Sequence, residues 1–148
     1  MRTVLLGFLS LLFFHLAFLS ADEEVFEFRG KHLVADYLDC DMEALSDEHA
    51  LIDVMLAAAQ KCGAQILGSN HYIFPGHGLT MTILLSESHA SIHTYPEHGK
   101  CFVDLFTCGE KCNNHVFNET LKDYLKPKNV AVIVLVRDDN ITELKNDL

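Results

Sequence analysis

An unbroken apolar run near the C-terminus restricts the fold of this chain more than any other feature. Residues 130–136 read Val-Ala-Val-Ile-Val-Leu-Val, without a polar interruption. β-Branched side chains such as these favour extended backbone over helix. A strand in which no polar residues alternate with the apolar ones is typical of a buried position in a sheet. The run therefore predicts a central strand that is covered on at least one face.

A helix is predicted over residues 47–62, where apolar side chains recur at helical spacing. Ser46 is the expected N-cap, and acidic residues follow it in the first turn, where the helix dipole favours them. Gly63 fits the C′ position that ends such a helix. The apolar positions are Ala50, Leu51, Val54, Met55, Ala58 and Cys62.

A second helix is predicted over about residues 115–125, between the capping pair Asn113-Asn114 and Pro127. The turn Pro75-Gly76-His77-Gly78 joins two expected strands into a hairpin. The expected strands cover residues 26–38, with Gly30 as a bend or bulge, and residues 64–74, 79–85 and 101–106.

These elements predict an α+β fold. A chain of 148 residues has room for one domain with a tail. Apolar residues make up 49% of it, which is enough for a hydrophobic core. Since the strands follow one another through hairpins, we expect a two-layer sandwich with a mainly antiparallel sheet and helices on one face.

The first 21 residues form a separate segment. Residues 4–21 are almost entirely apolar, with Arg2 before them and acidic residues after them. This order is typical of a signal peptide or a membrane anchor. Two alternatives stay open, namely a buried helix and a translation start near Val25. The domain proper is expected over residues 22–148, and membrane contact only through residues 4–21.

Charge and cysteine content restrict the class of protein. The net charge is −10 and no basic cluster occurs, which argues against a nucleic-acid-binding protein. A negative field of this kind attracts small substrates that carry positive charge. The five cysteines are too few, and odd in number, for a disulfide scaffold, so at least one thiol stays free or pairs between chains.

The segment after the hairpin concentrates side chains that carry chemistry. His89 and His93 would share a face on a helix, as zinc ligands do, but in extended chain they lie about 13 Å apart. No metal site is therefore expected. Ser88 and His93 are a possible nucleophile and general base, with Asp104 or Glu97 as the acid that orients the histidine. No Gly-x-Ser-x-Gly motif or Gly-rich oxyanion loop supports such a hydrolase.

Two longer stretches carry a family resemblance. The run from Glu87 to Glu97 reads ESHASIHTYPE, and the run from Val103 to Gly109 reads VDLFTCG. Both closely resemble the bacterial and archaeal S-adenosylmethionine decarboxylase proenzymes. The resemblance covers roughly residues 28–137, including Gly68 and the Gly30–Asp36 stretch. The apolar N-terminus is not part of it.

The resemblance implies that the cofactor is a pyruvoyl group derived from Ser88. In this family the serine Oγ attacks the carbonyl of the preceding residue, here Glu87, and the chain is cleaved between the two. His93 matches the residue that moves protons during processing. Thr80 stands where the family commonly has an assisting serine. Strand alternation places Ser88 and His93 on opposite faces, so the chain is expected to bend between them.

The resemblance also assigns residues to the decarboxylation itself. The pyruvoyl carbonyl forms a Schiff base with the substrate amine and withdraws electrons as the carboxylate leaves. Cys108 matches the proton donor. Phe74 and Tyr95 match the aromatic residues that hold the adenine, although Trp is usual where Tyr95 stands. Glu97 matches the acid that binds the ribose hydroxyls.

The function so implied is decarboxylation of S-adenosylmethionine to the aminopropyl donor for spermidine. Two alternatives stay open: an arginine or ornithine decarboxylase on the same scaffold, and a binding relative that does not process itself. The expected assembly is a homodimer of cleaved αβ protomers with no nucleic-acid partner. The substrate indicates the cytoplasm, whereas residues 4–21 indicate export or anchoring.

Overall fold

The computed structural model describes residues 29–108 and 111–138. The expected signal peptide or anchor, together with Phe26 and Phe28 of the first expected strand, lies outside these ranges. Within them, no helix is long and apolar enough to cross a membrane.

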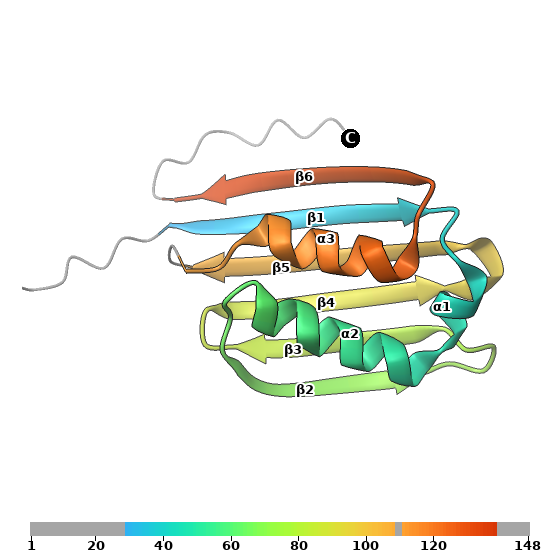
Figure 1. The fold of residues 1–148 in the computed structure, drawn as a ribbon. Coiled ribbons are helices and arrows are strands. Elements are labelled where there is room, and N and C mark those ends of the chain that lie inside the picture. The colour runs from blue at the N-terminus through green and yellow to red at the C-terminus, as the bar shows by residue number, and fades with distance from the viewer. Residues whose placement is uncertain (1–28, 109–110, 139–148) are drawn as a thin grey trace, which may run out of the picture.

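One antiparallel sheet of six strands runs through the molecule in the order β2-β3-β4-β5-β1-β6 (Figure 1). Every neighbouring pair is antiparallel, which confirms the predicted sheet type. The strands are β1 (Gly30–Leu38), β2 (Ile66–Ile73), β3 (Leu79–Leu85), β4 (Ser88–Tyr95), β5 (Lys100–Cys108) and β6 (Asn129–Arg137).

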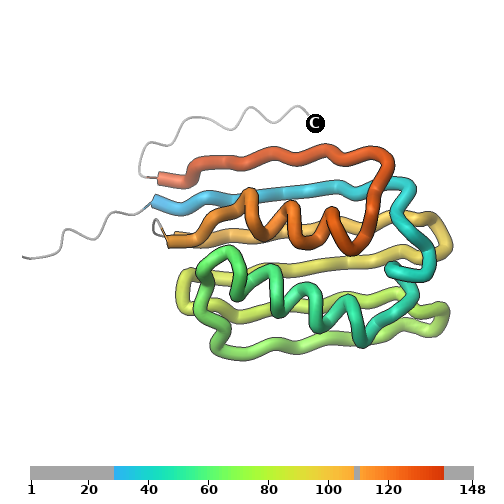
Figure 2. The backbone as a smooth tube through the Cα atoms, in the orientation of Figure 1, coloured from blue at the N-terminus to red at the C-terminus, as the bar shows by residue number. Residues whose placement is uncertain are grey.

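Two long helices lie on the same face of the sheet, as the smooth trace also shows (Figure 2). They are α2 (Glu48–Lys61) and α3 (Asn114–Leu125); a short helix α1 (Met42–Ser46) and a 3₁₀ turn η1 (Pro96–His98) complete the described elements. The predicted two-layer α+β sandwich is confirmed. We call the sheet face opposite α2 and α3 the open face.

The N-cap of α2 is Asp47, so the assignment of Ser46 to this role is wrong. The Asp47 carboxylate accepts a hydrogen bond from the backbone N–H of Ala50 at 3.0 Å. Ser46 is the last residue of α1, which Asp41 begins by accepting from Glu43 N–H at 2.9 Å. Because Asp41 starts a helix earlier than expected, the chain is already helical at Ser46.

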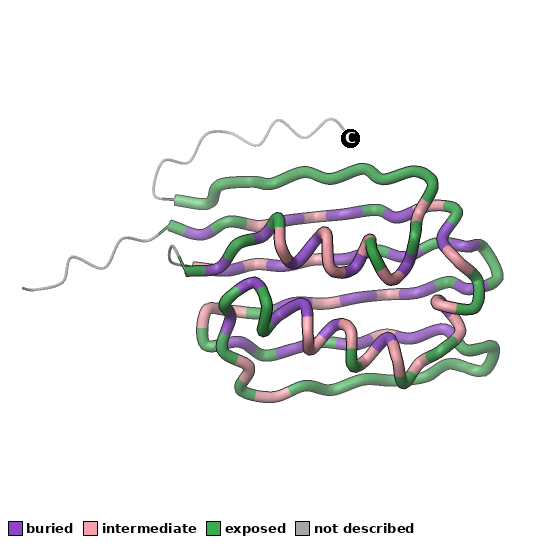
Figure 3. Tube along the Cα trace, viewed as in Figure 1, coloured by how far each residue is buried: buried purple, intermediate pink, exposed green. Residues whose placement is uncertain are grey.

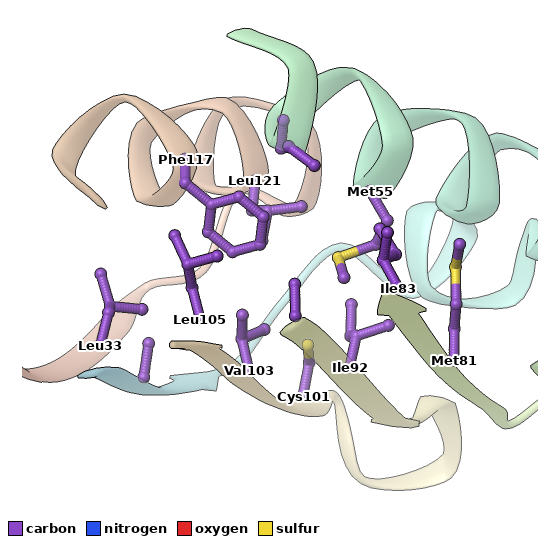
Figure 4. Close-up of a cluster of buried hydrophobic side chains, with 14 of the residues drawn as sticks. Leu33, Met55, Met81, Ile83, Ile92, Cys101, Val103, Leu105, Phe117 and Leu121 are labelled. Atoms are coloured by element: carbon purple, nitrogen blue, oxygen red, sulfur yellow. The ribbon is translucent and has the colours of Figure 1, made fainter. Parts of the chain in front are cut away.

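The hydrophobic core fills the space between the helices and the sheet. Phe117 and Leu121 of α3 point down onto Leu33 and Leu105, while Met55 of α2 lies over the other half of the sheet (Figure 4). In the strands alternate residues contribute to this layer, as the 2-residue period of a strand requires. The other alternate residues lie on the open face.

Strand β6 is an edge strand, so its prediction as a central, covered strand is wrong for a single chain. All nine of its residues are exposed (Figure 3). Alternate residues of β6, such as Ile133 and Leu135, lie on the open face because they pair with Val34 and His32 of β1. The apolar composition of β6 is typical of a buried strand, but a single chain does not bury it.

Gly30 forms no bend or bulge, contrary to the prediction. It pairs in regular register with Cys108 and Arg137. A Cβ atom there would lie 2.5 Å from the Phe106 ring. The glycine is therefore explained by the close approach of that ring and not by a turn.

Truncation of Phe117 tests the core directly. Phe117 is fully buried, so Phe117→Ala is expected to lower the free energy of unfolding by about 3–5 kcal/mol. His115→Ala is the control, since His115 is exposed on the same helix and its loss is expected to cost no more than about 0.5 kcal/mol. Urea denaturation followed by circular dichroism measures both. Equal effects of the two substitutions would contradict this packing.

Candidate active site

A cleft of about 630 Å³ opens at one end of the β2–β3 hairpin, which is within the usual size range of ligand pockets. Antiparallel pairing creates it, because the end of β2, the start of β3 and the end of β4 all meet there. Five residues that the sequence singled out line this cleft together. They are Phe74, Thr80, His93, Tyr95 and Glu97, accompanied by Pro75, Gly76, Gly78 and Thr94.

Thr80 and His93 are joined directly. They face one another across β3 and β4, and the Thr80 Oγ1 lies 2.9 Å from the His93 Nδ1. This hydrogen bond fixes the orientation of the imidazole ring. The residue to which the resemblance assigned proton movement, His93, is thus bonded to the residue expected to assist it.

The aromatic residues at the cleft are exposed. Phe74 is 48% exposed and meets Tyr72 edge to face, with 4.8 Å between ring centroids. Tyr95 is 42% exposed and meets Phe102 in the same manner at 5.7 Å. Each of these two rings contacts a neighbouring ring edge to face and is still exposed, so it is suited to stacking with a planar ligand.

Ser88 lies at the other end of β4, immediately after a two-residue turn formed by Ser86 and Glu87. Its φ of 146° falls in a region that residues other than glycine rarely adopt. The carbonyl of Glu87 accepts a hydrogen bond of 2.9 Å from the backbone N–H of Cys108. The bond between Glu87 and Ser88 therefore combines a strained residue with a polarised carbonyl.

Gln65 holds this turn in place. Its backbone carbonyl accepts a hydrogen bond of 2.9 Å from Ser86 N–H, and its N–H donates to Glu87 Oε2 at 3.0 Å. Although partial burial opposes it, the hydrogen bonds from Gln65 and Ser86 keep the pKa of Glu87 below its usual value. Sequence reasoning missed both Gln65 and the Cys108 N–H, because main-chain partners follow from strand register and leave no residue pattern.

Ser88 and His93 do not meet within one chain, and the predicted bend between them does not occur. Strand β4 pairs with β3 and β5 without a bulge from Ser88 to His93. Five residues of strand separate the two Cα atoms by about 16 Å. The candidate residues of one chain therefore form two separate groups, which we call half-sites: the Thr80–His93 cleft and the Glu87–Ser88 turn with Cys108.

The hydrolase interpretation finds no assembled triad. His93 is bonded to Thr80, whereas Asp104 lies 3.3 Å from His32 Nε2 and accepts a hydrogen bond from Ser91 at 3.3 Å. In the ranges that the structure describes, no three His, Cys, Asp or Glu side chains are grouped to hold a metal ion.

Known proteins match this chain along most of its length. A family model described as S-adenosylmethionine decarboxylase matches residues 31–138. The S-adenosylmethionine decarboxylase proenzyme of Thermotoga petrophila is 41% identical over 104 residues, which is 70% of this chain and 80% of that protein. The proenzyme of the same description from Methanococcus aeolicus is 37% identical over 108 residues, covering 73% and 92%.

A solved structure supports the same relationship. The crystal structure of the adenosylmethionine decarboxylase from Aquifex aeolicus superimposes with a TM-score of 0.68 and 29% sequence identity. The match covers 82% of this chain and 99% of that one. The family match extends from the second residue of β1 to the end of β6 and includes both half-sites. The chain belongs to the S-adenosylmethionine decarboxylase family.

Proposed function

We propose that this chain is a proenzyme that cleaves itself between Glu87 and Ser88 and then decarboxylates S-adenosylmethionine to the aminopropyl donor for spermidine. Family membership supports the reaction. One local observation carries the proposal for this chain: the Glu87 carbonyl accepts the Cys108 N–H at a bond whose serine has a φ of 146°.

The surroundings of this bond fit the formation of a pyruvoyl group from Ser88. The strained backbone of Ser88 costs about 1–3 kcal/mol, which attack on the bond would release. As Ser88 Oγ adds to the Glu87 carbonyl carbon, the Cys108 N–H stabilises the charge that develops on the oxygen. Oγ replaces the amide nitrogen, the hydroxyl proton passes to that nitrogen, and the amide becomes an ester.

A β-elimination then divides the chain: a base takes the Cα proton of residue 88, and the ester leaves its Cβ as the new main-chain carboxylate of Glu87. Residue 88 is now dehydroalanine, and its hydrolysis by water releases ammonia and leaves the pyruvoyl group. That group supplies a carbonyl which binds the substrate amine and withdraws electrons as carbon dioxide leaves. Cys108 lies beside the turn, and a thiol in this position is suited to return a proton to the carbon that loses the carboxylate.

The two half-sites are proposed to be completed by a second copy of the chain. His93 cannot reach Ser88 of its own chain across about 16 Å of regular strand. The open face that carries His93 also exposes apolar residues, including Leu84 at 57%, Phe102 at 37% and Ile133 at 61%. Pairing of two open faces would bury these residues and bring the His93 of one protomer towards the Glu87–Ser88 turn of the other. Strict alternation does not fix the face of Ser88 itself, because its φ of 146° lies outside regular strand geometry.

The cleft supports a nucleoside substrate. Phe74 and Tyr95 offer aromatic faces for the adenine, and Glu97 lines the same cleft with a carboxylate that can accept hydrogen bonds from the ribose hydroxyls. Neither arginine nor ornithine has a nucleobase to lie against the two rings or a ribose diol to donate to Glu97. The family matches do not favour arginine or ornithine as the substrate. Both half-sites also retain the residues expected for processing, which a relative that only binds a ligand would not need.

Removal of the Ser88 hydroxyl is expected to prevent cleavage. Purified wild-type protein should separate into fragments 1–87 and 88–148 in denaturing electrophoresis under reducing conditions, the first shorter if its N-terminus is trimmed. Ser88→Ala should stay intact. Cys108→Ala is the matched control: it keeps the backbone N–H, so it should still be cleaved, yet release little carbon dioxide from S-adenosylmethionine. A wild-type chain that stays whole after long incubation would refute the proposal.

Mixed dimers test whether a site is shared between protomers. Ser88→Ala and His93→Ala should each remain uncleaved alone. When the two variants are co-expressed with different tags, the intact Ser88 of one and the intact His93 of the other combine in one site. The His93→Ala chain should then be cleaved. If mixing restores no cleavage while both variants are folded dimers, the shared site is wrong.

Glu97→Gln tests the substrate. It keeps the shape of the side chain but removes the charge that accepts the ribose hydroxyls, a loss of about 1.5–3 kcal/mol. We expect a decrease of roughly ten- to a hundredfold in kcat/KM for S-adenosylmethionine, with self-cleavage unchanged. Carbon dioxide release from S-adenosylmethionine, arginine and ornithine is measured in parallel. An unchanged kcat/KM would show that Glu97 does not bind the substrate.

A further inference from the structure

Two buried thiols outside the proposed site lie close together. Cys62 ends α2 and Cys112 precedes α3, and their Sγ atoms are 4.0 Å apart although the residues are 50 positions apart in sequence. Both side chains are buried, with exposures of 2% and 4%. Neither takes part in the cleavage or the decarboxylation derived above.

The backbone holds the two segments against each other. The N–H of Asn113 donates to the Cys62 carbonyl at 2.8 Å. On the other side of Cys62, a Cβ atom at Gly63 would lie 2.8 Å from the carbonyl oxygen of Lys111. The φ of Gly63 is 97°, so glycine is needed both for the turn and for the close approach. The proximity of the thiols is thus imposed by main-chain contacts and not by flexible side chains.

We propose that Cys62 and Cys112 form a disulfide that joins the two fragments of the processed protein. A disulfide needs about 2.05 Å between sulfurs, so each Sγ must move by about 1 Å, which rotation of the side chains supplies. Cys62 precedes the bond between Glu87 and Ser88, and Cys112 follows it. After cleavage the disulfide would be a covalent link between fragment 1–87 and fragment 88–148.

The reaction balances with a low-molecular-weight disulfide, such as glutathione disulfide, as the oxidant. The thiolate of one cysteine attacks the oxidant, forms a mixed disulfide and releases one reduced thiol. The thiolate of the second cysteine then displaces the second reduced thiol. The protein loses two protons and two electrons, and the oxidant becomes two thiols.

Burial determines when this reaction takes place. It raises the pKa of Cys62, and burial together with the neighbouring Cys62 raises the pKa of Cys112 to about 12. Thiolates are therefore scarce in the folded protein, and oxidation there is slow. We expect the bond to form during folding in the presence of the oxidant, before the helices cover the two sulfurs.

The joining of fragments rests on the cleavage proposed above, whereas the bond itself does not. Full-length protein is refolded with glutathione disulfide, incubated until cleavage stops, blocked with iodoacetamide and analysed by electrophoresis and intact mass, with and without reductant. The expected result is one species without reductant and two fragments with it. Peptide mapping should identify a Cys62–Cys112 link, about 2 Da lighter than the two thiol peptides.

Three variants separate the possible outcomes. Cys62→Ser and Cys112→Ser should each give separate fragments without reductant, whereas Cys40→Ser, which removes another buried thiol from the same fragment as Cys62, should not. A chain that is uncleaved but carries the link by peptide mapping would support the disulfide and refute self-cleavage. Fragments that separate without reductant, with both thiols alkylated, would overturn the disulfide. A link that survives Cys62→Ser but not Cys40→Ser would also overturn it.

Discussion

The unbroken register of β4 between β3 and β5 determines where the proposed processing residues lie. Thr80 stands opposite His93 at one end of the strand, and Thr107 stands opposite Ser88 at the other. A slip of one residue would turn His93 towards the helices. Because strand length sets the separation of the two ends, no change of side-chain conformation brings Ser88 to His93 of the same chain. Catalysis that needs both residues needs two chains.

The strain at Ser88 persists because its surroundings hold the turn from several sides. The backbone of Ser88 is paired with Leu85 and Thr107, the Glu87 carbonyl is bonded to Cys108 N–H, and the Glu87 carboxylate is bonded to Gln65. Without any one of these contacts, the turn could release its strain by a change of conformation instead of by reaction. Gln65, which no motif singles out, is therefore as much a part of the proposed processing machinery as the catalytic side chains.

Local patterns predicted the two long helices α2 and α3 and the β2–β3 hairpin, because spacing, caps and turn residues act within a few positions. These patterns did not predict the features that depend on contacts between residues distant in the sequence. The apolar run of β6 indicated a covered strand, but a sequence does not show whether the cover comes from the same chain or from another. Ser46 lost the capping position to Asp47 because α1 begins earlier. The family resemblance identified the candidate residues of both half-sites; only the register showed that the two half-sites are separate.

The proposed cleavage at this turn would leave the sheet able to hold its shape. Strand β3 remains paired with β2, and β4 remains paired with β5, so neither new end is released from the sheet. Ile83 and Ile92 stay in the core on either side of the cut. The strained φ and the bond from Cys108 N–H exist only once β4 and β5 are in register. If the chain cleaves itself as proposed, folding must therefore come first, and the same antiparallel pairing would then hold the two fragments in place.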